Sequence, residues 1–143
     1  MLRVDFDMSA LDAQLGALQA TVADAIRPAA QAAAQVLYEE VRLNAPRSEK
    51  AHFTKGKNQQ FNPGNLQAAI YQAFSARASV PGKVATYEIS WNEQKAFYGR
   101  FVEYGTSKMP AHSFLRRAGE SHMAQALRAA DAEFTQRMQQ GDK

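Results

Sequence analysis

One apolar stripe of helical spacing runs through the first third of the chain and constrains the fold more than any other feature. Its residues recur at steps of three and four, which is typical of an amphipathic helix. Ser9 can cap this helix, with Asp12 in the capping-box position, and Asn44-Ala45-Pro46 ends it after about Leu43. Pro28 removes one backbone hydrogen bond and predicts a bend. The stripe contains Leu11, Leu15, Leu18, Val22, Ala25, Ile26, Ala29, Ala33, Val36, Leu37 and Val41.

Two interpretations of this stripe are open. It can face the core of its own domain along its whole length, as most amphipathic helices do. Alternatively, part of it can be left for a partner, because a small sheet cannot easily cover a helix of roughly 50 Å, at about 1.5 Å per residue. The alanine-rich run from Ala29 to Ala34 would let another backbone approach closely in either case.

The remaining patterns predict an α+β fold, in which a long N-terminal helix and a C-terminal helix pack on a small antiparallel sheet. Alternation of apolar and polar residues is the signature of half-buried strands, and Pro/Gly clusters predict turns. We predict a single domain, 1–143, in the order β-α-β-β-α-α. The first strand is Leu2–Phe6, and the long helix follows it. A helical turn at Leu66 then leads into a strand to Ala78, and a turn at 79–83 connects it to a second strand at Val84–Asn92. The last two helices are Glu93–Tyr104 and Phe114–Gln140, and Gly119 can break the second of them. The predicted stripe of the last helix is Met123, Leu127, Ala130, Phe134 and Met138.

The composition excludes several classes of protein. With 143 residues the chain can form one domain with a modest core, and without cysteine it has neither disulfides nor thiolate metal ligands. No apolar run approaches the roughly twenty residues of a membrane-spanning helix, and the N-terminus does not resemble a signal peptide. His52, His112 and His122 lie in different predicted settings, without metal-ligand spacing. We therefore predict no enzyme, with no catalytic residue, no cofactor, no metal and no membrane partner.

A basic segment at about 45–64 has no periodicity and is rich in Lys, Asn, Gln and Gly. Arg47, Lys50, Lys55 and Lys57 face only Glu49 there, while the net charge of the whole chain is a mild +3. The simpler interpretation is a mobile, solvated loop. Cations interleaved with Phe53 and Phe61 can also follow a nucleic-acid backbone and stack on its bases, so a transient contact with DNA or a neighbouring ring is the alternative.

The segment 101–118 joins two helical patterns through a compact turn. Phe97, Phe101 and Tyr104 share one helical face, and Gly105 stands where a helix often ends in a left-handed residue. Pro110 prevents the helix from continuing. The segment concentrates aromatic residues and a turn rather than ionisable groups, which indicates docking rather than catalysis.

This segment resembles the tail-completion, or minor-tail-protein-Z-like, proteins found at the head–tail junction of long-tailed phages. The resemblance rests on Val102-Glu103-Tyr104-Gly105-Thr106, then Met109-Pro110-Ala111, then Phe114-Leu115-Arg116. Gly64-Asn65-Leu66 adds a weaker match upstream, and His112-Ser113 departs from the proline more usual there.

The resemblance implies a structural subunit of virion assembly that joins the tail to the head. It would form a ring with itself, six-fold like the tail, beside neighbouring tail or connector proteins, after assembly in the bacterial host cytoplasm. A tail terminator or head-side stopper is the alternative within the class, and a DNA-binding protein the alternative outside it. The predicted assembly interface is Phe101, Glu103, Tyr104, Gly105, Thr106, Pro110, Phe114, Leu115 and Arg116.

Glu103 carries two interpretations within this interface. It can be an ordinary surface glutamate, although a negative charge near the end of a helix opposes the helix dipole. Alternatively it pairs with Arg116 or Arg117 across the turn, or with a basic group on another subunit.

Overall fold

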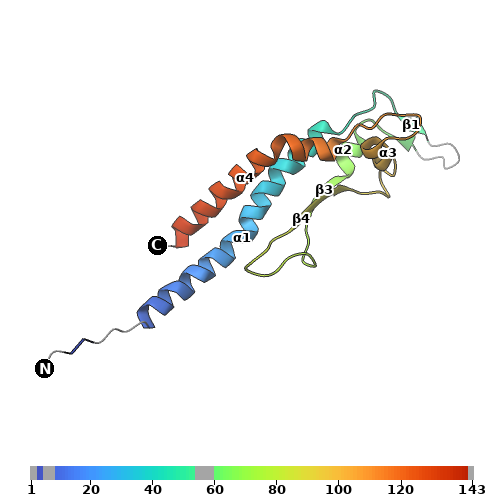
Figure 1. Ribbon diagram of the computed structural model, residues 1–143. Coiled ribbons are helices and arrows are strands. Elements are labelled where there is room, and N and C mark those ends of the chain that lie inside the picture. Colours follow the sequence, from blue (N-terminus) through green and yellow to red (C-terminus); the bar gives the residue numbers. More distant parts are fainter. Residues whose placement is uncertain (1–2, 5–8, 54–59, 142–143) are drawn as a thin grey trace.

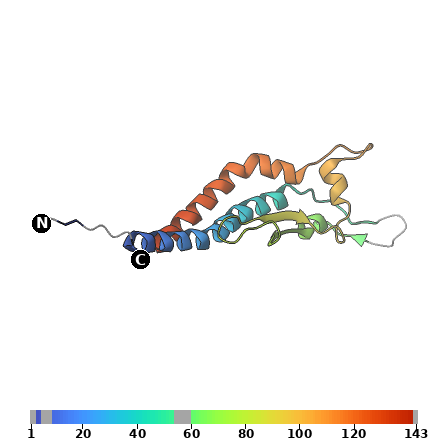
Figure 2. The same ribbon diagram turned by 60° about the horizontal axis from the view of Figure 1, so that its bottom comes forward.

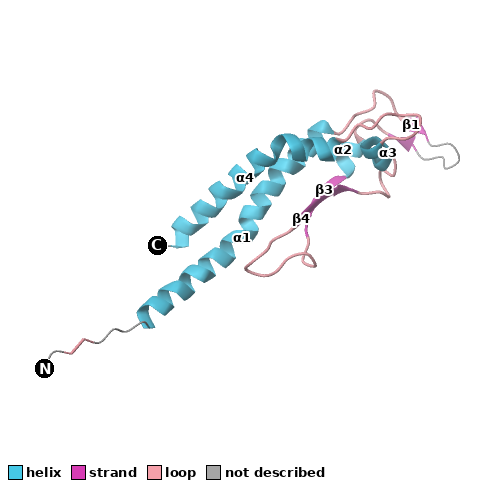
Figure 3. Cartoon of the chain, in the orientation of Figure 1, coloured by secondary structure: helices cyan, strands magenta, loops and turns pink. Residues whose placement is uncertain are grey.

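The computed structural model describes residues 3–4, 9–53 and 60–141 of the chain. Two long helices form a stem, and the shorter elements gather at one end of it and along one side (Figure 1). The predicted α+β class is confirmed, with helices far outweighing strands (Figure 3). The elements are α1 (Ser9–Asn44), β1 (His52–Phe53), β2 (Gln60–Phe61), α2 (Asn65–Ala69), β3 (Ile70–Phe74), β4 (Tyr87–Trp91), α3 (Gly99–Tyr104) and α4 (Phe114–Gly141).

The stem consists of α1 and α4, which run antiparallel (Figure 2). Near the start of α4, His122 Nε2 lies 3.3 Å from Glu40 Oε2 near the end of α1. At the other end of α4, Gly141 lies against Thr21 of α1. The predicted bounds of α1 are confirmed to within a residue, and α1 continues through Pro28.

Alanines rather than large side chains form the contact between the two stem helices. Ala25, Ala29 and Ala34 of α1 are buried, as are Ala118 and Ala126 of α4. Small side chains allow the two helix axes to approach closely, which stabilises the pair through many backbone-near contacts.

The stripe predicted for α4 is therefore partly wrong. Met123 and Leu127 are 47% and 60% exposed, because α4 turns its alanines rather than these residues toward α1. Ala130, Phe134 and Met138 are half-buried. The break predicted at Gly119 is also wrong, since α4 runs unbroken through it.

The hairpin of β3 and β4 lies beside α1 in Figure 1. Ile70 pairs with Trp91 at one end and Phe74 with Tyr87 at the other, in antiparallel register. The predicted change from a helical turn to a strand is confirmed, since α2 leads directly into β3. The strand predicted at Leu2–Phe6 lies mostly outside the described residues, and its described members, residues 3 and 4, lie in irregular backbone.

Two parts of the fold differ from the sequence prediction. The segment predicted to be a mobile loop contains, among its described residues, an antiparallel pair, β1 and β2, and Phe61 is 2% exposed with its ring edge-on to that of Tyr98 at 5.2 Å. Phe61 is therefore part of the interior and is not available to stack on a base. The helix predicted from Glu93 begins only at Gly99, because Asn92 Oδ1 accepts the Gln94 amide at 3.0 Å and holds a turn there.

The core lies at the end of the stem that carries α2 and α3, which we call the head. Phe114, the first residue of α4, is fully buried, and its ring meets that of Trp91 edge-on at 5.7 Å. Gly99 allows α3 to pack on the same indole, since a Cβ at this position would lie 2.7 Å from Trp91 Nε1. Leu66 and Ile70 belong to the same buried cluster. The core thus fixes the end of α3 relative to the start of α4.

Candidate assembly surface

The connection between α3 and α4, residues 105–113, is a tight turn that we call the α3–α4 turn. Gly105 follows α3 with φ 75° and ψ 175°, and its amide donates to the Phe101 carbonyl at 2.8 Å. This positive φ confirms the predicted need for glycine, although ψ is extended rather than left-handed helical, a region essentially restricted to glycine. A Cβ would also lie 2.7 Å from the backbone nitrogen of Ala111. Two hydrogen bonds between the backbones of Thr106 and Met109 close the turn.

Glu103 lies under this turn with 5% of its surface exposed. Its two carboxylate oxygens accept the backbone amides of Leu115 at 3.0 Å and Arg116 at 3.2 Å. Its own carbonyl accepts the Ser113 hydroxyl at 2.8 Å, and the carbonyl of Val102 accepts the His112 amide at 2.7 Å. The residue at the end of α3 is thus the cap of α4, satisfying amides that have no partner within their own helix.

The sequence interpretation of Glu103 as a surface residue is wrong, and so is its predicted pairing with an arginine side chain. The carboxylate of Glu103 lies at the start of α4, where the dipole of α4 stabilises a negative charge. This stabilisation outweighs the unfavourable interaction of the same charge with the dipole of α3. The Arg116 side chain instead lies near Glu120, with 3.7 Å between Nε and Oε1, on the surface of α4. Glu103 therefore acts within its own chain in this structure.

The nine residues predicted to form the assembly interface divide into a buried support and an exposed surface. Glu103 and Phe114 are buried, and Gly105 and Leu115 are half-buried. Phe101 and Tyr104 are 46% and 73% exposed, so the end of α3 presents two aromatic side chains to solvent beside the turn. Thr106, Pro110 and Arg116 are exposed as well, and Met109, which the sequence analysis did not select, adds a side chain that is 39% exposed.

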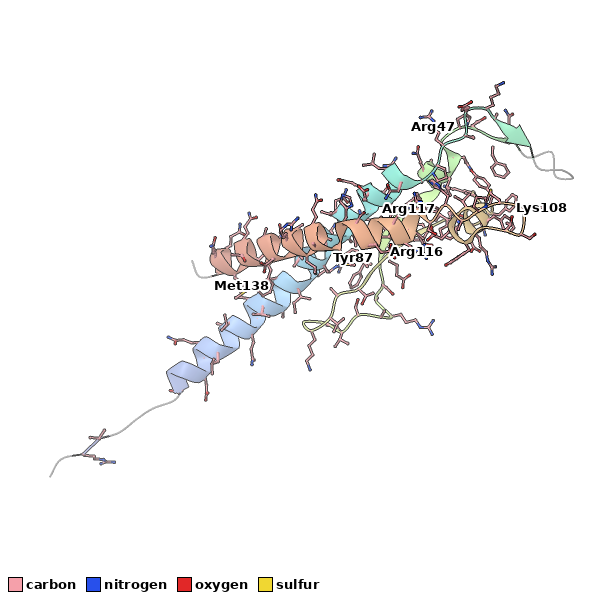
Figure 4. All side chains as sticks on the ribbon, turned by 45° about the horizontal axis from the view of Figure 1, so that its top comes forward. Arg47, Tyr87, Lys108, Arg116, Arg117 and Met138 are labelled. Atoms are coloured by element: carbon pink, nitrogen blue, oxygen red, sulfur yellow. The ribbon has the colours of Figure 1, made fainter. Side chains whose placement is uncertain are left out.

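The head is strongly basic. Figure 4 shows Arg47, Lys108, Arg116 and Arg117 together at this end of the molecule. Over the described residues from 42 to 64 and from 92 to 117, eight cations are exposed, against the exposed carboxylates of Glu49 and Glu93 and the buried one of Glu103. Lys55 and Lys57 lie outside the described residues. The eight cations are Arg42, Arg47, Lys50, Lys95, Arg100, Lys108, Arg116 and Arg117.

A cavity of about 360 Å³ lies between the segment that follows α1 and the α3–α4 turn. Its lining is mostly apolar and includes Leu66, Tyr98, Met109 and Pro110. Arg47 lines the same cavity, so the predicted basic segment and the predicted docking turn form one continuous surface. The sequence suggested these two features separately but gave no sign that they adjoin.

The described residues hold no group of three His, Asp or Glu that could bind a metal ion. Within the same residues, no helix combines the length and apolar character that crossing a membrane requires.

Residues 9–105 match the family model described as "Bacteriophage HK97-gp10, putative tail-component". The chain belongs to this HK97-gp10-like family. The match includes α1, the hairpin and α3 with Glu103 and Tyr104, and it ends at Gly105, before the rest of the α3–α4 turn. This membership agrees with the resemblance to tail-completion proteins, and it makes the protein a structural phage tail component. Neither a curated protein nor a solved structure gives a significant match.

Proposed function

We propose that this HK97-gp10-like protein is the tail-completion subunit that joins a finished tail to the head. Family membership supports a structural role in the tail and in the virion. The observation that carries the proposal further is the end of α3 beside the α3–α4 turn, where Phe101 and Tyr104 are exposed and where Glu103 and Gly105 fix the course of the chain into α4. Large aromatic residues on a preorganised loop are the anchors that interfaces use most, because little entropy is lost on docking.

In this proposal the subunits form a six-fold ring matching the tail. The aromatic side chains at the end of α3 dock against a neighbouring tail or connector protein, and the surrounding cations set its orientation. No catalysis is required, because the mechanism is only the burial of exposed side chains on contact. The ring would be assembled in the bacterial host cytoplasm before the head and tail meet.

Complementation of a phage that lacks this gene tests the proposal. We would supply the wild-type protein, the double variant Phe101→Ser/Tyr104→Ser, or the control Leu127→Ser, which removes an apolar side chain that is 60% exposed on the stem. Electron microscopy should show full heads and tails of normal length, unjoined, with the double variant only. Virions that form normally with the double variant would overturn the assignment of the turn.

The same micrographs separate the proposal from the alternatives in its class. Tails of uncontrolled length would indicate a tail terminator, and heads that have lost their DNA would indicate a head-side stopper. Either result would reject tail completion while keeping the family's structural role in the tail.

DNA binding is a second candidate function, and the surplus of cations on the head favours it. Exposed cations that neutralise phosphates release counterions, so the logarithm of the binding constant should fall linearly with the logarithm of the salt concentration. We would measure this slope with a short DNA duplex for the wild type, for Arg47→Ala/Lys108→Ala, and for Arg128→Ala on the stem as the control. A slope reduced by roughly two in the head variant alone would support the candidate, at about one unit per phosphate contact. Absence of salt-dependent binding would reject it.

A further inference from the structure

The two stem helices have different lengths, so α1 projects beyond α4. Gly141 at the end of α4 lies against Thr21, so Ser9–Ala20 of α1 extends beyond it, and within this segment Gln14, Ala17 and Leu18 face the last turns of α4 across a groove. We call this part of α1 the overhang, and Figure 1 shows it extending past the C-terminal end of α4. Every residue from 12 to 20 is exposed.

The overhang continues the apolar stripe that α1 buries farther along. Leu15, Leu18, Val22, Ala25 and Ala29 follow at steps of three, four, three and four, the spacing of a helix that packs against another helix. Ala25 and Ala29 are buried in the stem, at 1% and 8% exposure. Leu15 and Leu18 are each 49% exposed. The exposed leucines are thus a direct extension of an established helix–helix interface.

A groove marks the place where α4 stops. It has a volume of about 630 Å³ and lies between the overhang and the last turns of α4. Leu18 and Thr21 of α1 line one side, and Phe134 and Met138 of α4 line the other. Polar side chains, among them Gln14, Thr135 and Gln139, line the groove together with these apolar ones.

Apart from Asp12, the flanks of the stripe carry no charge that would repel a second copy of the same helix. Gln14, Gln19 and Thr21 border the leucines, and Asp12 is the single charged residue from 9 to 20. Flanking charges are what normally set partner choice between packed helices, with like charges opposing association. Uncharged flanks leave a self-complementary surface.

We propose that the overhang of a second copy of this chain occupies this site, antiparallel to the first. Because α4 is antiparallel to α1, an antiparallel partner overhang enters the line of α4 just beyond Gly141. The N-terminus of the partner's α1 then faces the C-terminus of α4, an arrangement that the two helix dipoles favour. A parallel partner would instead bring the ends of both copies of α4 to the same level on the same face.

The geometry gives a two-fold symmetric dimer in which each overhang covers the leucines of the other. The overlap is short, roughly 18 Å at 1.5 Å per residue, so the buried area falls below the roughly 1,200 Å² of a standard stable interface. Association of the free protein is accordingly weak, with a dissociation constant in the micromolar range or above, about 8 kcal/mol or less.

Sedimentation velocity of the full chain over a concentration series tests the proposal. Leu15→Asp should weaken the dimer by at least tenfold, because it places a charge in the apolar contact. The control Ala20→Asp adds the same charge on the opposite face of the helix and should leave the dimer intact. A wild-type chain that remains monomeric up to millimolar concentration would overturn the proposal, as would equal weakening by both variants.

Two further measurements decide the orientation. The chain has no cysteine, so a single Leu15→Cys substitution near the middle of the overhang should give a disulfide-linked dimer, whereas Ala20→Cys should not. Small-angle X-ray scattering of the dimer should show a rod with the two heads at opposite ends, since α1 alone is about 54 Å long at 1.5 Å per residue. Heads lying side by side would overturn the antiparallel arrangement. These experiments use the isolated protein, so their outcome is independent of the role in the virion.

Discussion

The α3–α4 turn and the overhang of α1 both leave large apolar side chains exposed, but they are held in place differently. At the turn, Tyr104 is the last residue of α3, and a buried carboxylate and a positive-φ glycine fix the backbone on either side of it. In the overhang, Leu15 stands on a helix whose residues are held by hydrogen bonds to their near neighbours. The surface at the turn thus depends on hydrogen bonds to residues distant in sequence, whereas the surface of the overhang depends on its own helix.

The largest effect should come from removing the conformational freedom of the turn. Gly105→Ala forces a side chain into a φ of 75° and places its Cβ 2.7 Å from the Ala111 backbone nitrogen. We expect a loss of roughly 3 kcal/mol in the free energy of unfolding, measured by urea denaturation. Gly119→Ala is the matched control, because its Cβ would have no atom within 4 Å and it lies inside α4. That variant should gain about 0.5–1 kcal/mol. A similar loss in both variants would show that the turn is not specially constrained.

The next effect concerns the cap that supports the turn. Glu103→Ala removes the acceptor of the Leu115 and Arg116 amides and should cost about 2 kcal/mol of unfolding free energy. Glu120→Ala removes an exposed carboxylate near the side chain of Arg116 and should lower the free energy of unfolding by less than about 0.5 kcal/mol. Thermal unfolding of the two variants side by side measures the difference. If the Glu103→Ala protein keeps its stability but no longer assembles, Glu103 contacts a partner on another subunit instead of supporting its own chain.

Local patterns in the sequence predicted the parts of the fold that local interactions determine. The stripe and the caps placed α1 from Ser9 to about Leu43, and alternation placed the hairpin strand that ends at Trp91. Periodicity did not show which face of α4 meets α1. Met123 and Leu127 look like core residues in the sequence but are exposed. The close approach of the two helices depends instead on alanines of α1 and of α4.

The candidate site was predictable in its residues but not in their roles. The turn chemistry of Gly105 and the aromatic spacing of Tyr104 can be read from neighbouring positions. The capping role of Glu103 cannot, because its partners lie twelve and thirteen residues away across the turn. A carboxylate at an unfavourable helix end was the one available signal, and it indicated a partner without identifying which.

The smallest effect should come from the overhang, where the comparison with the interior is sharpest. Leu15→Ala removes a side chain that is 49% exposed on the part of α1 that extends beyond Gly141, and alanine has the higher helix propensity. In dilute, monomeric protein we expect a change in unfolding free energy below about 0.5 kcal/mol. Leu66→Ala makes the same chemical change at a residue that is 2% exposed in the head core, and it should cost about 2–5 kcal/mol. Urea denaturation at low protein concentration measures both variants. If Leu15→Ala destabilises the monomer as much as Leu66→Ala does, the overhang is covered within its own chain and leaves no surface for a second copy.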